Sequence, residues 1–213
     1  MLGRNWVLAT AVLVLAAGPA VAASWSDDFS DGDINGWTTV TATASYALRG
    51  GYDSLQLAVA GGAPSPGEAY HASDVAYGTW TFWTNGDNNS HPEVRFLDDG
   101  AGNYYAVSLN CGNGTAKIVR ADGGVETELL TGSPADARWY GGTNHGVVWQ
   151  ITRALDGGCT VQYEAGGEPD GSYTFATAGT FTDNTFTSSS RFTVWVQQHS
   201  SSPMNMWVSD ITV

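Results

Sequence analysis

The sequence predicts an all-β protein built as a two-sheet antiparallel sandwich. The chain of 213 residues contains 27 Gly, many of them in Asn-Gly or Asp-Gly pairs. Such pairs supply the positive-φ residues that tight hairpins require. The segments between them are rich in β-branched and aromatic residues, which favour strands. After the N-terminal apolar segment, no ten-residue stretch has the 3.6-residue period of an amphipathic helix.

The composition excludes several other classes of protein. Hydrophobic residues make up 42% of the chain and aromatic residues 12%, so the chain can bury enough surface to fold. The formal net charge is −13, from 21 acidic and 8 basic residues. Nucleic-acid binding depends on Lys and Arg that neutralise phosphates, so this balance argues against a nucleic-acid partner.

Residues 1–23 are predicted to form a secretory signal peptide. Arg4 gives a positive start, an apolar run extends from Trp6 to Ala17, and the small residues 20–22 suit a cleavage site. The run is too short to cross ~30 Å of hydrocarbon. Cleavage after Ala22 or Ala23 would leave one domain, residues 24–213, in an extracellular or cell-surface location.

Eight segments of that domain are predicted to be strands, because turn residues recur about every ten residues between them. They are Tyr77–Thr84, Glu93–Asp98, Tyr104–Asn110, Ala116–Arg120, Val147–Arg153, Thr160–Glu164, Arg191–Gln198 and Met206–Val213. Alternation of side chains assigns one face of these strands to the core. The predicted core residues are Trp80, Phe82, Val94, Phe96, Tyr105, Val107, Leu109, Trp149, Ile151, Val161, Tyr163, Phe192, Val194 and Val196.

Four segments resemble the concanavalin A-like lectin/glucanase superfamily of laminin G-like jelly rolls. Asp27–Trp37 looks like its first strand and turn, and Val208–Val213 like its last strand. Tyr77–Leu109 and the hairpin of Trp149–Tyr163 are similar to its central strands. The resemblance implies a two-sheet jelly roll with a concave face that often binds glycans.

The strand faces opposite the predicted core carry a mixture of aromatic and polar side chains. A flat aromatic ring can cover the C–H face of a sugar, while polar side chains hydrogen-bond to its hydroxyl groups. The alternative is that the tryptophans fill a second, minor core and that the polar residues face solvent. The predicted glycan-binding residues are Trp83, Glu93, Arg95, Tyr104, Trp195, Gln197 and His199.

Asp31, Asp33 and Asn35 precede Gly36 in the pattern D-x-D-x-N-G, the first half of a calcium loop. Ala42 stands where an EF-hand has its bidentate Glu, so a complete EF-hand is excluded. The resemblance implies a structural calcium ion between the first and last strands, which would add Asp210. The alternative is an Asx turn that leads into the following strand.

The chain has two cysteines, Cys111 and Cys159. Outside the reducing cytosol two cysteines can pair in only one way, so a disulfide between them is predicted. Buried free thiols are the alternative.

The sequence contains no complete catalytic motif that we identify. The E-x-D-x-E motif of the glucanases is absent, and the nearest pair, Glu126 and Glu128, is interpreted as a solvated hairpin. His91 is expected to be structural or exposed. The leading hypothesis is therefore a secreted, noncatalytic, carbohydrate-binding module with an extracellular glycan as its partner. The alternatives are an extracellular polysaccharide hydrolase or lyase on the same fold, and a structural or adhesive surface protein.

Overall fold

The computed structural model describes residues 23–87, 90–110, 114–131, 146–197 and 201–213. Within these ranges the regular elements are fifteen β-strands, and all paired strands are antiparallel. None of the described residues belongs to a helix that could span a membrane.

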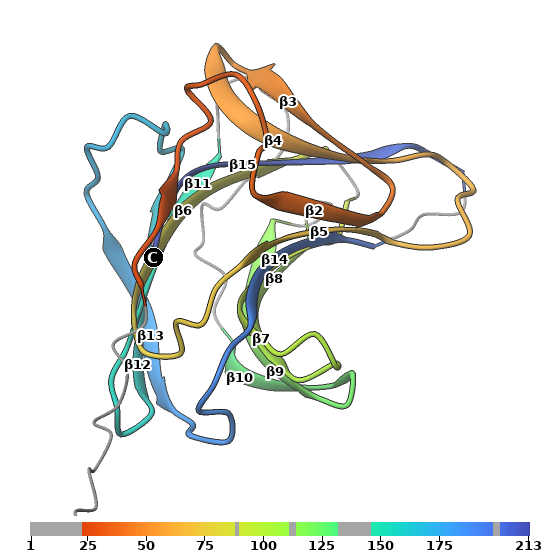
Figure 1. Cartoon of the computed structure of the whole chain (residues 1–213). Helices are drawn as coiled ribbons and strands as arrows, with labels where there is room; N and C mark the ends of the chain where they lie inside the picture. The colour runs from red at the N-terminus through yellow and green to blue at the C-terminus, as the bar shows by residue number, and fades with distance from the viewer. Residues whose placement is uncertain (1–22, 88–89, 111–113, 132–145, 198–200) are drawn as a thin grey trace, which may run out of the picture.

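The strands form two sheets that face each other as curved layers (Figure 1). The first sheet consists, in spatial order, of β13 (Ala176–Thr182), β12 (Gly158–Ala165), β11 (Val147–Arg153), β6 (Gly78–Gly86), β15 (Met204–Thr212), β4 (Tyr52–Val59) and β3 (Thr43–Arg49), with β1 (Ser26–Asp27) paired to β15. The second sheet consists of β10 (Val125–Thr131), β9 (Thr115–Asp122), β8 (Tyr104–Asn110), β7 (Pro92–Asp98), β14 (Arg191–Val196), β5 (Gly67–Ala72) and β2 (Trp37–Thr41). The predicted two-sheet sandwich of jelly-roll type is confirmed.

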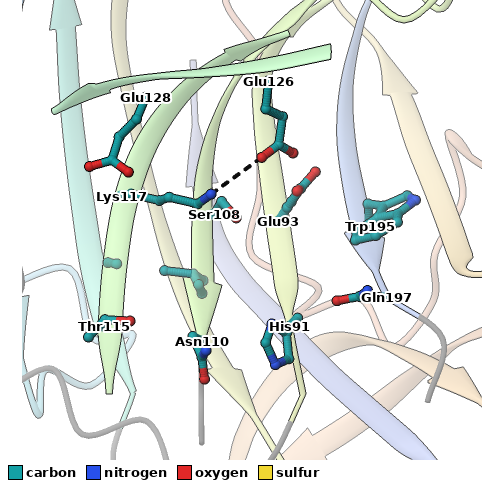
Figure 2. A pocket seen from close by; sticks show the side chains of 12 residues that line it. His91, Glu93, Ser108, Asn110, Thr115, Lys117, Glu126, Glu128, Trp195 and Gln197 are labelled. Atoms are coloured by element: carbon teal, nitrogen blue, oxygen red, sulfur yellow. Dashed lines mark hydrogen bonds and ion pairs between the residues drawn. The ribbon is translucent and has the colours of Figure 1, made fainter. Parts of the chain in front are cut away.

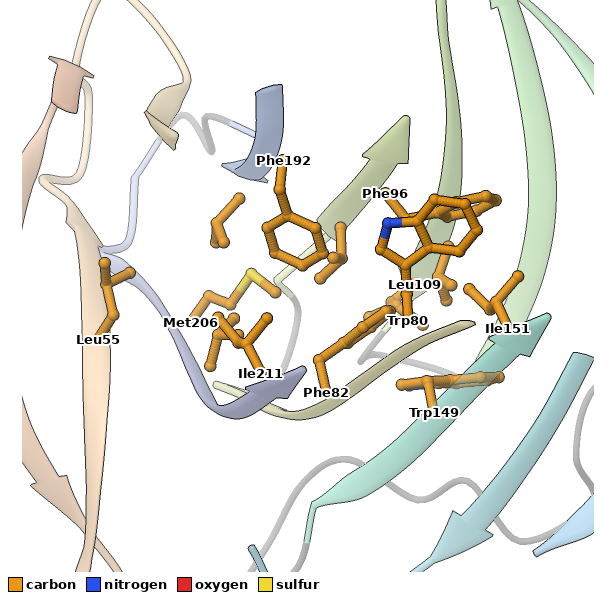
Figure 3. Close-up of a cluster of buried hydrophobic side chains, with 14 of the residues drawn as sticks. Leu55, Trp80, Phe82, Phe96, Leu109, Trp149, Ile151, Phe192, Met206 and Ile211 are labelled. Atoms are coloured by element: carbon orange, nitrogen blue, oxygen red, sulfur yellow. The ribbon is translucent and has the colours of Figure 1, made fainter. Parts of the chain in front are cut away.

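The hydrophobic core lies between the sheets and contains the residues that alternation assigned to it (Figure 3). Trp80 on the first sheet and Phe96 on the second pack with their ring centroids 5.2 Å apart. Trp149 is buried beside them, and only Tyr163 among the predicted core residues is partly exposed. Each fully buried side chain of this size contributes roughly 1.5–3 kcal/mol through burial, so the core accounts for the pairing of the two layers.

A β-bulge in β7 decides which of its side chains face outward. The register with β8 shifts between Arg95 and Leu97, so that Leu97 pairs with Tyr105 and both side chains enter the core. Arg95 and Glu93, before the bulge, lie on the opposite face. The extra residue of a bulge therefore keeps the core packed while the strand presents charged groups outward.

The structure does not show the predicted disulfide between Cys111 and Cys159. Cys159 is a buried free thiol whose sulfur lies 3.7 Å from the carbonyl oxygen of Gly157. It lies at the end of the sandwich where Tyr105, the second residue of β8, hydrogen-bonds to Asp183. Cys111 itself is outside the described residues.

Candidate functional site

A cavity of about 530 Å³ lies on the concave outer face of the second sheet (Figure 2). Cavities of this size are typical of sites for small molecules or short chain segments. Side chains from or next to five adjacent strands, β10, β9, β8, β7 and β14, surround it. They are His91, Glu93, Ser108, Leu109, Asn110, Thr115, Ala116, Lys117, Glu126, Glu128, Trp195 and Gln197.

Strand register brings these side chains into rows across the sheet. Trp195 pairs with Glu93, Glu93 with Ser108, and Ser108 with Lys117. Directly paired residues point to the same face of a sheet, so this row forms the floor of the cavity. Glu126 and Glu128 on the edge strand β10 close it from one side (Figure 2).

Glu93 is the most buried carboxyl group in the cavity, with 5% of its surface exposed. Both Nε and Nη2 of Arg95 donate to its Oε2 at 3.1 Å. Burial raises the pKa of Glu93 to about 7; the charge of Arg95 opposes this shift and a hydrogen bond from Glu126 adds to it. Glu93 is therefore partly protonated near neutral pH.

Glu126 interacts with two further polar side chains of the site. It accepts hydrogen bonds from Tyr104 Oη at 3.2 Å and from Lys117 Nζ at 3.4 Å. Burial, together with the charges of Glu93 and Glu126, raises the pKa of Tyr104 above its ordinary value although Arg95 opposes the rise. Tyr104 therefore remains a neutral hydroxyl group that can donate.

Trp195 supplies a large aromatic ring to the cavity wall, and this ring is partly exposed. The guanidinium of Arg95 lies 5.2 Å from the centroid of this ring and 4.0 Å from that of Tyr104. Arg95 and Tyr104 are not among the lining residues and lie next to them. Chemically, the arrangement offers an aromatic platform surrounded by hydrogen-bond donors and acceptors.

The structure brings together most of the predicted glycan-binding residues. Glu93, Trp195 and Gln197 line the cavity, and Arg95 and Tyr104 contact the residues that do. His199 lies outside the described residues.

Trp83 is not part of this site, and its predicted role is wrong. It lies in the first sheet, fully buried, and packs with Val148 and Trp207. Its Nε1 donates to the carbonyl oxygen of Gly167 at 2.9 Å. Trp83 therefore belongs to a minor core beneath the segment that follows β12, which is the alternative that the sequence left open.

Most of the other lining residues were not predicted, among them His91, Lys117, Glu126 and Glu128. The interpretation of Glu126 and Glu128 as a solvated hairpin holds, because both are exposed on the β9–β10 hairpin, but Glu126 also accepts hydrogen bonds from Tyr104 and Lys117. The sequence does contain a relevant pattern, because the two glutamates alternate along one strand and so share one face. That face lies near Glu93 because the sheet is curved, and this curvature cannot be read from the sequence.

The four predicted calcium ligands do not assemble as expected. Asp31 Oδ1 accepts the backbone N–H of Asp33 at 3.2 Å, and Asp33 Oδ1 accepts that of Asn35 at 2.8 Å, so this segment is a series of Asx turns. Asp31 and Asp210 do line a common hollow of about 340 Å³ with Asp27 and Asp28. Among the described residues, however, no three His, Cys, Asp or Glu side chains are placed to hold a metal ion.

Comparison with solved structures identifies the fold, whereas no protein-family model and no curated protein matches the chain in sequence. The carbohydrate-binding module CBM66 from Bacillus subtilis superposes with a TM-score of 0.58 at 12% identity, over 83% of this chain and 93% of that one. The β-glucanase of Bacillus licheniformis gives 0.61 at 11% identity, over 89% and 96%. The exoplasmic/lumenal domain of VIP36, in a form bound to Ca²⁺ and Man, gives 0.60 at 10% identity, over 89% and 88%. The chain thus has the concanavalin A-like jelly-roll fold, which binders and enzymes share.

Proposed function

We propose that the protein binds a glycan chain in the cavity on the concave face of its second sheet, with Trp195 as the stacking platform. The observation that carries this proposal is the position of a partly exposed indole beside convergent polar side chains. Neutral sugars are recognised by this combination, because the ring covers C–H groups while carboxyl, amide and hydroxyl groups bond to the sugar hydroxyls. The named functions of the structural neighbours, carbohydrate binding and glycan hydrolysis, support the same ligand class.

Isothermal titration with a soluble β-glucan and with mannooligosaccharides tests the proposal. The Trp195→Ala variant should bind at least about tenfold more weakly, a loss of about 1.4 kcal/mol. Trp83→Phe is the matched control, since it changes an indole that is buried in the first sheet, and it should bind as the wild type does. Wild-type protein that binds neither probe, or binding that survives Trp195→Ala, would contradict the proposal.

Binding without catalysis is favoured by the surroundings of Glu93. Its side chain is buried, and its Oε2 accepts two hydrogen bonds from Arg95. Glycosidases instead need two carboxyl groups that both reach the bond to be cleaved, one as acid and the other as nucleophile or base. The contacts of Glu93 with Arg95 hold it as part of the cavity floor.

A polysaccharide hydrolase is the second candidate, because a carboxyl group with a pKa of about 7 suits a general acid near neutral pH. In that case Glu93 would protonate the leaving oxygen, and Glu128 across the cavity would be the second carboxylate. Incubation with the same β-glucan should then release oligosaccharides. Release should fall by orders of magnitude in Glu93→Gln, whereas a binder releases none in either protein.

We also propose that the protein is exported and that residues 1–23 are removed as a signal peptide. The pattern of a positive start, an apolar run and small residues supports this. Intact-mass measurement of the protein recovered from the medium of an expressing host should give a chain that begins at Ala23 or Ser24. A chain that retains Met1 in the cells would contradict it.

A structural calcium ion is proposed only at the hollow lined by Asp28, Asp31 and Asp210. Carboxylate oxygens are the ligands that this ion prefers, and binding requires the side chains to draw closer than they are here. Burial, and the charges of Asp28 and Asp170, raise the pKa of Asp210, so removing its charge should stabilise the calcium-free protein. Asp210→Asn should therefore raise the melting temperature without calcium and reduce the stabilisation that added calcium gives the wild type. If added calcium leaves the melting temperature of the wild type unchanged, the site does not exist.

A further inference from the structure

Arg95 contacts both of the groups on which the proposed glycan site depends. It lies two residues after Glu93 on the same face of β7, and two of its N–H groups donate to the Glu93 carboxylate at 3.1 Å. Its guanidinium also lies within cation–π distance of the rings of Trp195, on the neighbouring strand β14, and of Tyr104, on β8. One planar group thus links three strands of the sheet.

Arg95 is nevertheless not placed to bind the ligand itself. Only 11% of its side chain is exposed, and it is not among the residues that line the cavity, although Glu93 and Trp195 are. Its faces are occupied by aromatic rings and two of its donors by a carboxylate.

We infer that Arg95 is a positioning residue, which fixes the ring of Trp195 and the carboxyl group of Glu93 for a glycan that it does not touch. This inference rests on the proposed function and replaces the direct contact that the sequence suggested. It explains why a cation is buried here: a planar guanidinium can stack on rings and donate two bonds at once, which an ammonium cannot do. Loss of Arg95 should therefore disturb the platform and the carboxyl group together.

The experiment compares Arg95→Met and Arg95→Lys with the control Arg191→Met. Arg191 has closely matched chemistry on the same face of the sheet. Its Nε donates to Asp98 at 3.0 Å, its Nη2 lies 3.2 Å from Glu68, and its guanidinium is 4.9 Å from the ring of Tyr70. It does not line the cavity, so its loss should affect stability and not binding.

Affinity for the soluble β-glucan and for mannooligosaccharides is measured across a pH series. Arg95→Met should bind at least about tenfold more weakly, Arg95→Lys should lie between it and the wild type, and Arg191→Met should stay within about twofold. The positive charge of Arg95 opposes the rise in the pKa of Glu93. The pH at which affinity changes should therefore move upward in Arg95→Met, and this displacement should vanish when Glu93→Gln is added.

The outcomes separate this inference from the proposed function. If the wild type binds neither probe, the proposed function fails. If the wild type binds and Arg95→Met binds equally well, only the inference fails. Equal losses in Arg95→Met and Arg191→Met, with no change in the pH profile, would also overturn it, because they would indicate a general loss of structure. Should Arg95→Met fail to fold, Arg95→Lys decides: affinity equal to that of the wild type overturns the inference, and several-fold weaker binding at unchanged melting temperature supports it.

Discussion

At the scale of single residues, Glu93 should make stability depend on pH. Its pKa is about 7 in the folded protein, against an ordinary value of 4.5. Between these two values the folded state holds a proton that the unfolded chain has released, so the free energy of unfolding falls as pH rises through this window. Glu93→Gln cannot ionise, and it should therefore be more stable than the wild type above pH 7, by up to about 3 kcal/mol.

Chemical denaturation of both proteins over a series of pH values checks this expectation. The difference in unfolding free energy should grow from about pH 4.5 to about pH 7 and then level off. A variant that is less stable than the wild type at every pH would mean that the Glu93 charge is fully compensated by Arg95.

Cys159 should behave as an inert thiol. Burial raises its pKa to about 11, although the adjacent Arg153 opposes the shift, and only the thiolate reacts readily. A thiol reagent should therefore label Cys159 in denaturant and not in the native protein. A reducing agent should leave the melting temperature unchanged, whereas a fall of several degrees would reveal a disulfide.

At the scale of elements, the two predicted tryptophans separate into different roles because they lie in different sheets. Trp83 on β6 joins the minor core with Val148 and Trp207, beneath the segment that follows β12. Trp83→Ala should cost about 3–5 kcal/mol of stability and leave glycan affinity unchanged at temperatures where the variant is folded. Trp195→Ala should weaken glycan binding and change stability little. Denaturation curves and binding titrations of both variants distinguish the two roles.

The eight predicted strands are all present, whereas several others, among them β3, β4 and β5, were not among the eight. Strong turn residues and dense β-branched and aromatic residues identified strands such as β8 and β11. Thr43–Arg49 and Gly67–Ala72 contain more Ala, Ser and Gly, which carry weak strand preferences. They become strands because β4 and β14 offer them partners, and such pairing is decided by the tertiary structure.

At the scale of the whole molecule, the sequence determines the faces of strands and leaves their spatial order open. Glu93 and Trp195 both alternate with core residues, so their outward position was predictable. Their proximity depends on the order β7–β14, which joins segments about a hundred residues apart. Glu126 and Trp83 show two ways in which the sequence could not predict the residues of the site. The curvature of the second sheet brings Glu126 into the site, whereas Trp83 lies outside it because its strand belongs to the first sheet.

The excess of negative charge should make salt stabilise the protein without strengthening its binding of neutral glycans. With a formal net charge of −13, repulsion among the carboxylates opposes the compact state. Salt at ~0.1 M limits this repulsion to about 10 Å, so the melting temperature should rise between low and moderate ionic strength. An uncharged β-glucan carries no charge for the ions to screen, so its affinity should remain constant over the same range. A polyanionic glycan of equal length should be repelled at low salt. If such a glycan instead binds most tightly at low salt, this expectation is contradicted. The cations of the site, Arg95 and Lys117, would then have to bind the ligand in place of their present partners, Glu93 and Glu126.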